Sequence, residues 1–111
     1  MEVWFATSEI GKRLGSDKTR RKTFGDEIGH RVYRRLLELQ AAPSLGAMKT
    51  LPGRCHELTG DRKGQLAVDV TKNVRLVFEP ADEPCPRLDD DGLDWGGVKS
   101  VRILEVGDYH D

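Results

Sequence analysis

Residues 54–79 read RCHELTGDRKGQLAVDVTKNVRLVFE, and this stretch decides the fold. Within it, apolar and polar residues alternate with the period of two that is typical of half-buried strands. The alternation predicts strands at residues 54–58, 65–70 and 74–79. The connections between them are short and rich in Gly, Asp, Asn and Lys, which are turn residues or polar surface residues. Three strands joined by short turns form an antiparallel meander.

The flanking segments extend this sheet at both ends. Residues 99–106 are apolar on both faces, which predicts a strand in the interior of the sheet. Near the N-terminus, the aromatic and β-branched residues 2–6 predict a short strand, and residues 8–14 a short helix. The polar and basic stretch 16–22 is expected to be a loop or the frayed start of the next helix.

A long helix is predicted between residue 23 and Pro43. Its apolar stripe follows helical spacing and consists of Phe24, Ile28, Val32, Leu36 and Leu39. Thr23 followed by Asp26 has the form of a capping box, and Pro43 ends the helix. Strands that follow helices in the chain indicate an α+β fold. We therefore expect a small antiparallel sheet of four to five strands, with N-terminal helices packed on one face.

The composition predicts a soluble protein rather than a membrane-embedded one. The chain has 111 residues, which suits one domain, and we expect a single domain over residues 1–111. No apolar run reaches the roughly 18 residues of a membrane span, and no signal-peptide pattern is present, so we expect a cytoplasmic protein. Cys55 and Cys85 form no disulfide framework and lack metal-ligand spacing, so no metal is expected.

The net charge of −1 hides a strong asymmetry. Residues 1–78 carry 15 Lys and Arg against 9 Asp and Glu, a net of +6. Residues 79–111 carry 3 against 10, a net of −7. Most of the acid falls in residues 80–97, a stretch of Pro, Gly and Asp that is predicted to be a long acidic loop inserted between two strands. The remainder of the chain is basic enough to bind a polyanion.

The polar residues suit metal-free cleavage of RNA. RNA carries its own nucleophile, the 2′-hydroxyl, so the protein has to supply a base, an acid and a cation at the phosphate. Histidine suits the proton transfers because its unperturbed pKa lies near 6.5. Arginine suits the phosphate because it is always charged and fork-shaped. His56, His110 and Arg75 offer these groups, and Tyr109 offers a ring for stacking on a base.

Three local motifs together resemble HigB-type toxins, which belong to the RelE/ParE superfamily of bacterial toxin–antitoxin systems. The motifs are LPGRCHELTGDRKG at residues 51–64, NVRLVF at residues 73–78 and the terminal Asp108-Tyr109-His110. The match runs from about Phe24 to the C-terminus, except in residues 80–97. The chain departs from the family in being slightly acidic overall, and the acidic loop would repel RNA if it covered the active face.

The resemblance implies a RelE-like fold and a ribosome-dependent endoribonuclease that cuts mRNA without a metal or cofactor. It also implies three partners: a cognate HigA-like antitoxin with a helix-turn-helix, the ribosome and mRNA. The catalytic residues carried over from the family motifs are His56, Arg75, Asp108, Tyr109 and His110. The residues expected to contact RNA are Arg54, Arg62 and Lys63.

Two other functions are compatible with the same sequence. One is a toxin that binds DNA gyrase, like ParE-type toxins, although that role requires no proton-transferring histidine. The other is a decayed toxin that binds a partner protein only. Arg31, Arg34 and Arg35 are expected to form a solvated helix face.

Overall fold

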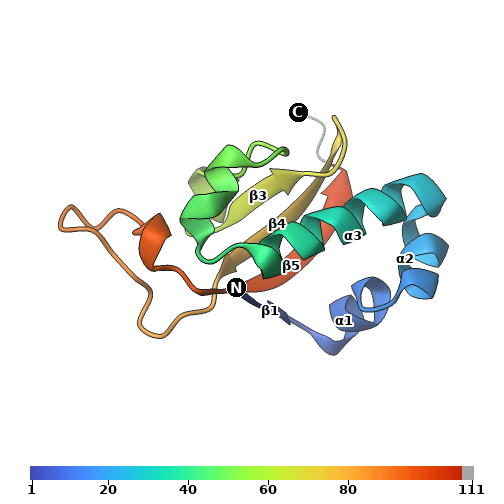
Figure 1. The fold of residues 1–111 in the computed structure, drawn as a ribbon, viewed down its shortest axis with the longest axis horizontal. Coiled ribbons are helices and arrows are strands. Elements are labelled where there is room, and N and C mark those ends of the chain that lie inside the picture. Colours follow the sequence, from blue (N-terminus) through green and yellow to red (C-terminus); the bar gives the residue numbers. More distant parts are fainter. Residues whose placement is uncertain (109–111) are drawn as a thin grey trace.

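The computed structural model describes residues 1–108 and contains one five-stranded sheet in the order β1-β5-β4-β3-β2 (Figure 1). The strands are β1 (Glu2–Phe5), β2 (His56–Glu57), β3 (Leu66–Asp69), β4 (Val74–Pro80) and β5 (Ser100–Asp108). All neighbours pair antiparallel except β1 and β5, which pair parallel. The predicted α+β class and the antiparallel meander are confirmed.

Strand β5 occupies the interior position that its apolar character predicts. It lies between β1 and β4, and its register with β4 runs from Asp108 opposite Val74 to Val101 opposite Pro80. A register shift between Val77 and Phe78 marks a bulge in this ladder. The two ends of the β4–β5 ladder therefore hold different features: the C-terminal end of β5 at one end, and the 80–97 loop at the other.

Three helices precede the meander: α1 (Ser8–Leu14), α2 (Asp17–Phe24) and α3 (Asp26–Ala41). The prediction of a loop or frayed helix start at residues 16–22 is wrong, because Ser16 caps a separate helix by accepting a hydrogen bond from the Thr19 amide. The Thr23–Asp26 capping box is also wrong. Thr23 lies in the last turn of α2. Gly25, with φ +85°, interrupts the helical conformation and so separates α2 from α3.

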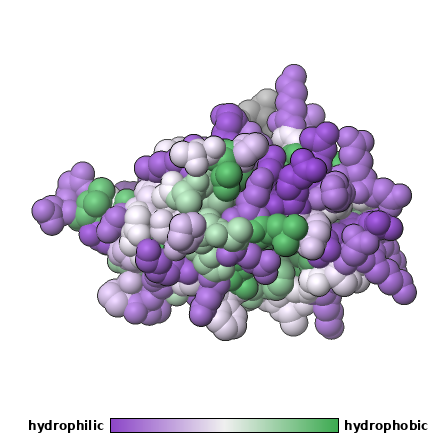
Figure 2. All heavy atoms as spheres, in the orientation of Figure 1, coloured by the Kyte–Doolittle hydropathy of each residue, from purple (hydrophilic) through white to green (hydrophobic). Residues whose placement is uncertain are grey.

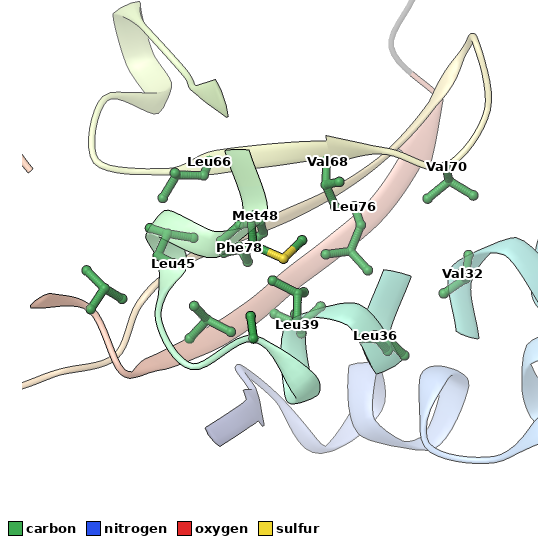
Figure 3. Packing of buried hydrophobic residues seen from close by; sticks show 14 of the residues in the cluster. Val32, Leu36, Leu39, Leu45, Met48, Leu66, Val68, Val70, Leu76 and Phe78 are labelled. Carbon is green, nitrogen blue, oxygen red and sulfur yellow. The ribbon is translucent and has the colours of Figure 1, made fainter. Parts of the chain in front are cut away.

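The core lies between α3 and the sheet. Val32, Leu36 and Leu39 of the predicted stripe are buried, and they face buried residues of β3 and β4 (Figure 3). A 3₁₀ turn, η1 (Leu45–Thr50), adds Leu45 and Met48 to the same cluster. Each fully buried side chain of this size stabilises the fold by about 1.5–3 kcal/mol. The helices therefore cover one face of the sheet and leave the other for polar side chains.

Strand β2 is much shorter than the predicted strand at residues 54–58. Only His56 and Glu57 pair with β3. Gly53 and Arg54 precede them with positive φ angles of +104° and +50°, and such a backbone cannot continue a strand. The chain therefore turns sharply just before the histidine.

The helix-covered surface is predominantly hydrophilic, and so is most of the 80–97 loop that projects from one end of the molecule (Figure 2). Within residues 1–108, no helix combines the length and the apolar character needed to cross a bilayer.

The contact of α2 with α3 depends on Gly29. A Cβ atom at this position would lie 3.0 Å from the Arg20 carbonyl oxygen and 3.1 Å from its carbon, both in the α2 backbone. We expect Gly29→Ala to lower the free energy of unfolding by about 1–2 kcal/mol through overpacking, although Ala favours a helix over Gly by about 1 kcal/mol. Urea denaturation measures the change. His30→Ala, exposed on the same helix, is the control and should stay within about 0.5 kcal/mol; stabilisation by Gly29→Ala would contradict the packing.

Candidate functional site

The sheet face opposite the helices, here called the open face, carries a row of four residues across four strands. His56 on β2 lies opposite Ala67 on β3, Ala67 opposite Val77 on β4, and Val77 opposite Glu105 on β5. Directly paired residues project from the same face of a sheet. The short strand therefore places His56 on the open face, away from the core.

A second row lies next to the first, toward the C-terminal end of β5. Asp69 on β3 pairs with Arg75 on β4, and Arg75 pairs with Gly107 on β5. Arg75 is half-buried, and Gly107 leaves the space beside it without a side chain. Asp108 follows at the end of β5, opposite Val74, and is exposed. Tyr109 and His110 lie outside the described residues.

The His56 ring is held by the backbone. Its Nδ1 lies 2.6 Å from the carbonyl oxygen of Arg54. A carbonyl oxygen only accepts hydrogen bonds, so Nδ1 is the donor. In the neutral ring the other nitrogen, Nε2, then carries the lone pair and acts as a proton acceptor. The arrangement makes His56 chemically suited to the role of a base.

Arg54 and Asp69 form a second contact beside the histidine. Arg54 Nε donates to Asp69 Oδ2 at 2.8 Å, and 77% of the Arg54 side chain is exposed. Asp69 also lies opposite Arg75 in the β3–β4 ladder. Nothing in the local sequence signals the Arg54–Asp69 contact, because it joins the turn before β2 to the end of β3.

Arg62 lies across the open face. It comes from the 3₁₀ turn η2 (Gly60–Arg62), and its guanidinium pairs with Glu105 on β5 at 2.5 Å and with Gln65 at 2.9 Å. The Arg62–Glu105 contact joins this turn to β5, in the row that also holds Ala67 and Val77, and both of these residues are fully buried. A phosphate at Arg62 would have to compete with Glu105.

Lys63, the third residue expected to contact RNA, faces the acidic loop instead of Arg75. It lines a hollow of about 420 Å³ together with Glu57, Arg87, Asp90 and Asp91. The loop carboxylates in this hollow lower the electrostatic attraction of Lys63 for an anion. Of the three candidate RNA contacts, Arg54 is thus the one adjacent to the row that holds Arg75.

The acidic loop is anchored at the end of the sheet remote from Asp108. Leu93 and Val98 are buried in the core cluster, and Trp95 Nε1 donates to Glu57 at 3.0 Å. The tip carries Asp89, Asp90 and Asp91, all exposed. Because the loop leaves β4 after Pro80 while Arg75 lies near the start of that strand, the loop does not cover the Arg75 end of the open face (Figure 1).

Asp82 fastens this loop to the start of β5. Its carboxylate accepts hydrogen bonds from the Lys99 amide at 3.0 Å, the Ser100 amide at 3.0 Å and the Ser100 hydroxyl at 2.9 Å. Burial by itself would raise the pKa of Asp82, but these hydrogen bonds outweigh it and lower the pKa below its usual value. The ionised carboxylate therefore stabilises the folded loop.

Cys55, beside His56, is poorly suited to act as a nucleophile. Burial raises the pKa of its thiol to about 12, so the thiol is protonated at neutral pH. Within residues 1–108, no group of three or more His, Cys, Asp and Glu side chains is arranged to hold a metal ion.

The order of the strands, the N-terminal helices on one face and the polar open face form an α+β fold that also occurs in solved structures of other proteins. The chain is similar to a YoeB/ParE toxin from Agrobacterium tumefaciens, with a TM-score of 0.60 and 10% identity over 99% of this chain and 100% of the other. It is also similar to the YoeB dimer from Staphylococcus aureus, with a TM-score of 0.54 and 14% identity over 100% and 98%. No family model and no curated protein matches the chain. The likeness establishes the fold, and the HigB-type resemblance stays a prediction from the motifs.

The role of Asp82 is open to a pH test. A group whose pKa is lowered by folding stabilises the protein above its unfolded-state pKa, about 3.8 here, and loses that contribution as the pH falls through the folded-state value. We expect Asp82→Ala to lower the free energy of unfolding by about 1–2 kcal/mol at neutral pH. The difference from wild type should vanish in strong acid, as followed by urea denaturation across pH. Asp89→Ala at the exposed tip is the control. An equal loss of unfolding free energy in both variants would contradict the role of Asp82 as the anchor of the loop.

Proposed function

We propose that the chain is the toxin component of a type II toxin–antitoxin system and that it cleaves mRNA on the ribosome without a metal. The observation that supports this best is the placement of His56 and Arg75 in adjacent rows of one exposed sheet face, with Asp108 at the same end. One similar structure is named a YoeB/ParE toxin, and another is named a YoeB dimer. The HigB-type motifs assign the finer identity.

The proposed reaction uses the substrate's own nucleophile. A base takes the proton of the 2′-hydroxyl, the oxygen attacks the adjacent phosphorus, and the bond from phosphorus to the 5′-oxygen breaks. An acid returns a proton to the departing oxygen. The products are a 2′,3′-cyclic phosphate and a 5′-hydroxyl. Atoms balance without an added water, oxidant or metal.

The residues divide these tasks by position. His56 and His110 share the proton transfers, Arg75 binds the scissile phosphate, and Asp108 and Tyr109 position the reacting groups. His56 and Arg75 lie two strands apart and are offset by two residues along the strands, which gives about 12 Å between backbones at about 4.8 Å per strand and about 3.4 Å per residue. Their side chains extend over the same face, so a phosphate between them lies within reach of both. Arg54 lines the same region and contributes a further positive charge.

Screening limits the effect of the acidic loop on this region. The ladder from Val74 to Pro80 separates the two ends by about 20 Å at about 3.4 Å per residue. The Debye length at physiological salt is about 8 Å, so exposed charges at that separation are largely screened. The net charge of +6 on residues 1–78 therefore governs RNA binding at the Arg75 end.

The proposed function requires a defined set of partners. These are the ribosome and mRNA as target, and a cognate HigA-like antitoxin with a helix-turn-helix that neutralises the toxin. Since ribosomes and mRNA occupy the cytoplasm, we assign the protein to that compartment, with no membrane partner.

Replacing Arg75 tests the phosphate site. We expect Arg75→Ala to slow translation-coupled mRNA cleavage by about 10²–10³-fold, because a charged donor to the transition state is lost. Purified protein, ribosomes and mapping of the mRNA ends provide the measurement. The matched control is Arg102→Ala, an arginine paired with Glu79 at the loop end of the same ladder, and it should stay within about threefold.

Other outcomes of the same assay identify other functions. Undiminished cutting by a His56→Ala, His110→Ala double variant would refute the assigned proton transfers. Intact mRNA together with DNA damage on expression would identify a gyrase-binding toxin instead. Normal growth on expression without an antitoxin would identify a module that only binds a partner protein.

Removing the charge of the loop tip tests its separation from the site. We expect the combined Asp89→Asn, Asp90→Asn and Asp91→Asn variant to cleave within about twofold of wild type at physiological salt, because the charges are screened at this range. The control is Asp108→Asn, which changes one charge at the Arg75 end and should slow cleavage more than the triple variant does. A large gain from the triple variant would mean that the loop repels RNA.

A further inference from the structure

The backbone that holds His56 adopts a conformation that side chains rarely take. Arg54, whose carbonyl oxygen accepts from His56 Nδ1, has φ +50°, in the left-handed region. A residue with a Cβ atom is disfavoured there and needs support from its surroundings. The position of this carbonyl is therefore a consequence of the contacts around residue 54.

Asp69 supplies that support through its carboxylate and its amide, while its carbonyl is held by helix α3. Its carboxylate accepts from Arg54 Nε at 2.8 Å, and its amide donates to the Gly53 carbonyl at 2.6 Å. Its own carbonyl accepts from Arg35 Nε of α3 at 2.8 Å. Gly53 is tightly enclosed, since a Cβ atom there would lie 2.6 Å from Val68 Cγ2. One residue of β3 thus fixes the whole turn that precedes the histidine.

We propose that Arg54 and Asp69 are positioning residues that hold His56 in the tautomer with the proton on Nδ1. The Nε2 lone pair is then the base for the substrate's 2′-hydroxyl. The chemical consequence rests on the proposed function, while the tautomer itself does not. The same Asp69 lies opposite Arg75 in the β3–β4 ladder. One residue therefore fixes the position of the base, His56, relative to the phosphate-binding Arg75.

A pair that positions His56 and a pair that only stabilises the fold have different measurable effects. The Arg54 side chain is mostly exposed, and exposed ion pairs contribute little to folding. A merely structural pair would therefore affect neither the tautomer nor the rate. A positioning pair would affect both and leave the fold intact.

Two substitutions at one residue provide the test. Gly accepts positive φ without strain, so Arg54→Gly should keep the carbonyl in place although the side chain is lost. Ala does not, so Arg54→Ala should release the carbonyl from His56. ¹⁵N NMR of the histidine ring in the full chain, at a pH where the ring is neutral, reports which nitrogen carries the proton. We expect Nδ1–H in wild type and Arg54→Gly, and a shift toward Nε2–H in Arg54→Ala.

The rate of cleavage gives a second readout. We expect Arg54→Ala to lower kcat by about tenfold or more, a part of what a general base contributes. Arg54→Gly loses the same RNA contact, so both variants should raise KM, but Arg54→Gly should retain a kcat several-fold higher than that of Arg54→Ala. Asp69→Asn keeps an oxygen for Arg54 Nε and should rescue most of the kcat that Asp69→Ala loses.

Several results would overturn the proposal. These are Nε2–H in the wild-type protein, an unchanged tautomer in both Arg54→Ala and Asp69→Ala, or equal kcat losses in Arg54→Gly and Arg54→Ala. Thermal unfolding of each variant excludes a folding defect as the cause. A chain that showed the tautomer pattern but cut no RNA would refute the proposed function and leave the positioning intact.

Discussion

The pairing of β4 with β5 is the constraint on which the rest of the structure depends. It joins residues 74–80 to residues 101–108 and so fixes both ends of the sheet at once. One end receives Arg75, Gly107 and Asp108. The other end receives the acidic loop, whose carboxylate at Asp82 holds the first residues of β5. With β5 held in this way, its free edge pairs with β1, and the helices that follow β1 cover the sheet.

The parts of the fold that sequence predicts are those with a strong local period. The stripe of α3, the strands around Val68 and Leu76 and the interior strand β5 each carry their pattern within a few residues. Helix α2 was missed because its residues are nearly all polar, and only the Ser16 cap marks its start. The parallel pairing of β1 was missed because parallel partners lie far apart in the chain. A two-residue β2 has too little sequence to show a period.

The sequence singles out individual candidate residues of the site, but it does not predict the contacts between them. Alternation along β4 places Arg75 on the face opposite Leu76, and motif resemblance singles out His56. The contact of Arg54 with Asp69 joins the turn before β2 to β3, and that of Arg62 with Glu105 joins the turn η2 to β5. Side-chain contacts of this kind depend on the relative shift of strands, which sequence period leaves undetermined. The acidic loop lies away from Arg75 because the two occupy opposite ends of the β4–β5 ladder. The sequence alone does not determine this placement.

A weak surface contact is energetically sufficient to select a tautomer. A tenfold preference between two ring tautomers requires about 1.4 kcal/mol. A hydrogen bond to a backbone carbonyl contributes about 0.5–1.5 kcal/mol net, which is of the same size. The Arg54–Asp69 pair has only to keep one carbonyl in place, and the left-handed backbone that it opposes costs about 1–3 kcal/mol. The hydrogen bond and the strain are of similar size, so even the small contribution of the pair decides whether the carbonyl stays in place. A glycine at position 54 removes the opposing strain and so no longer needs the pair.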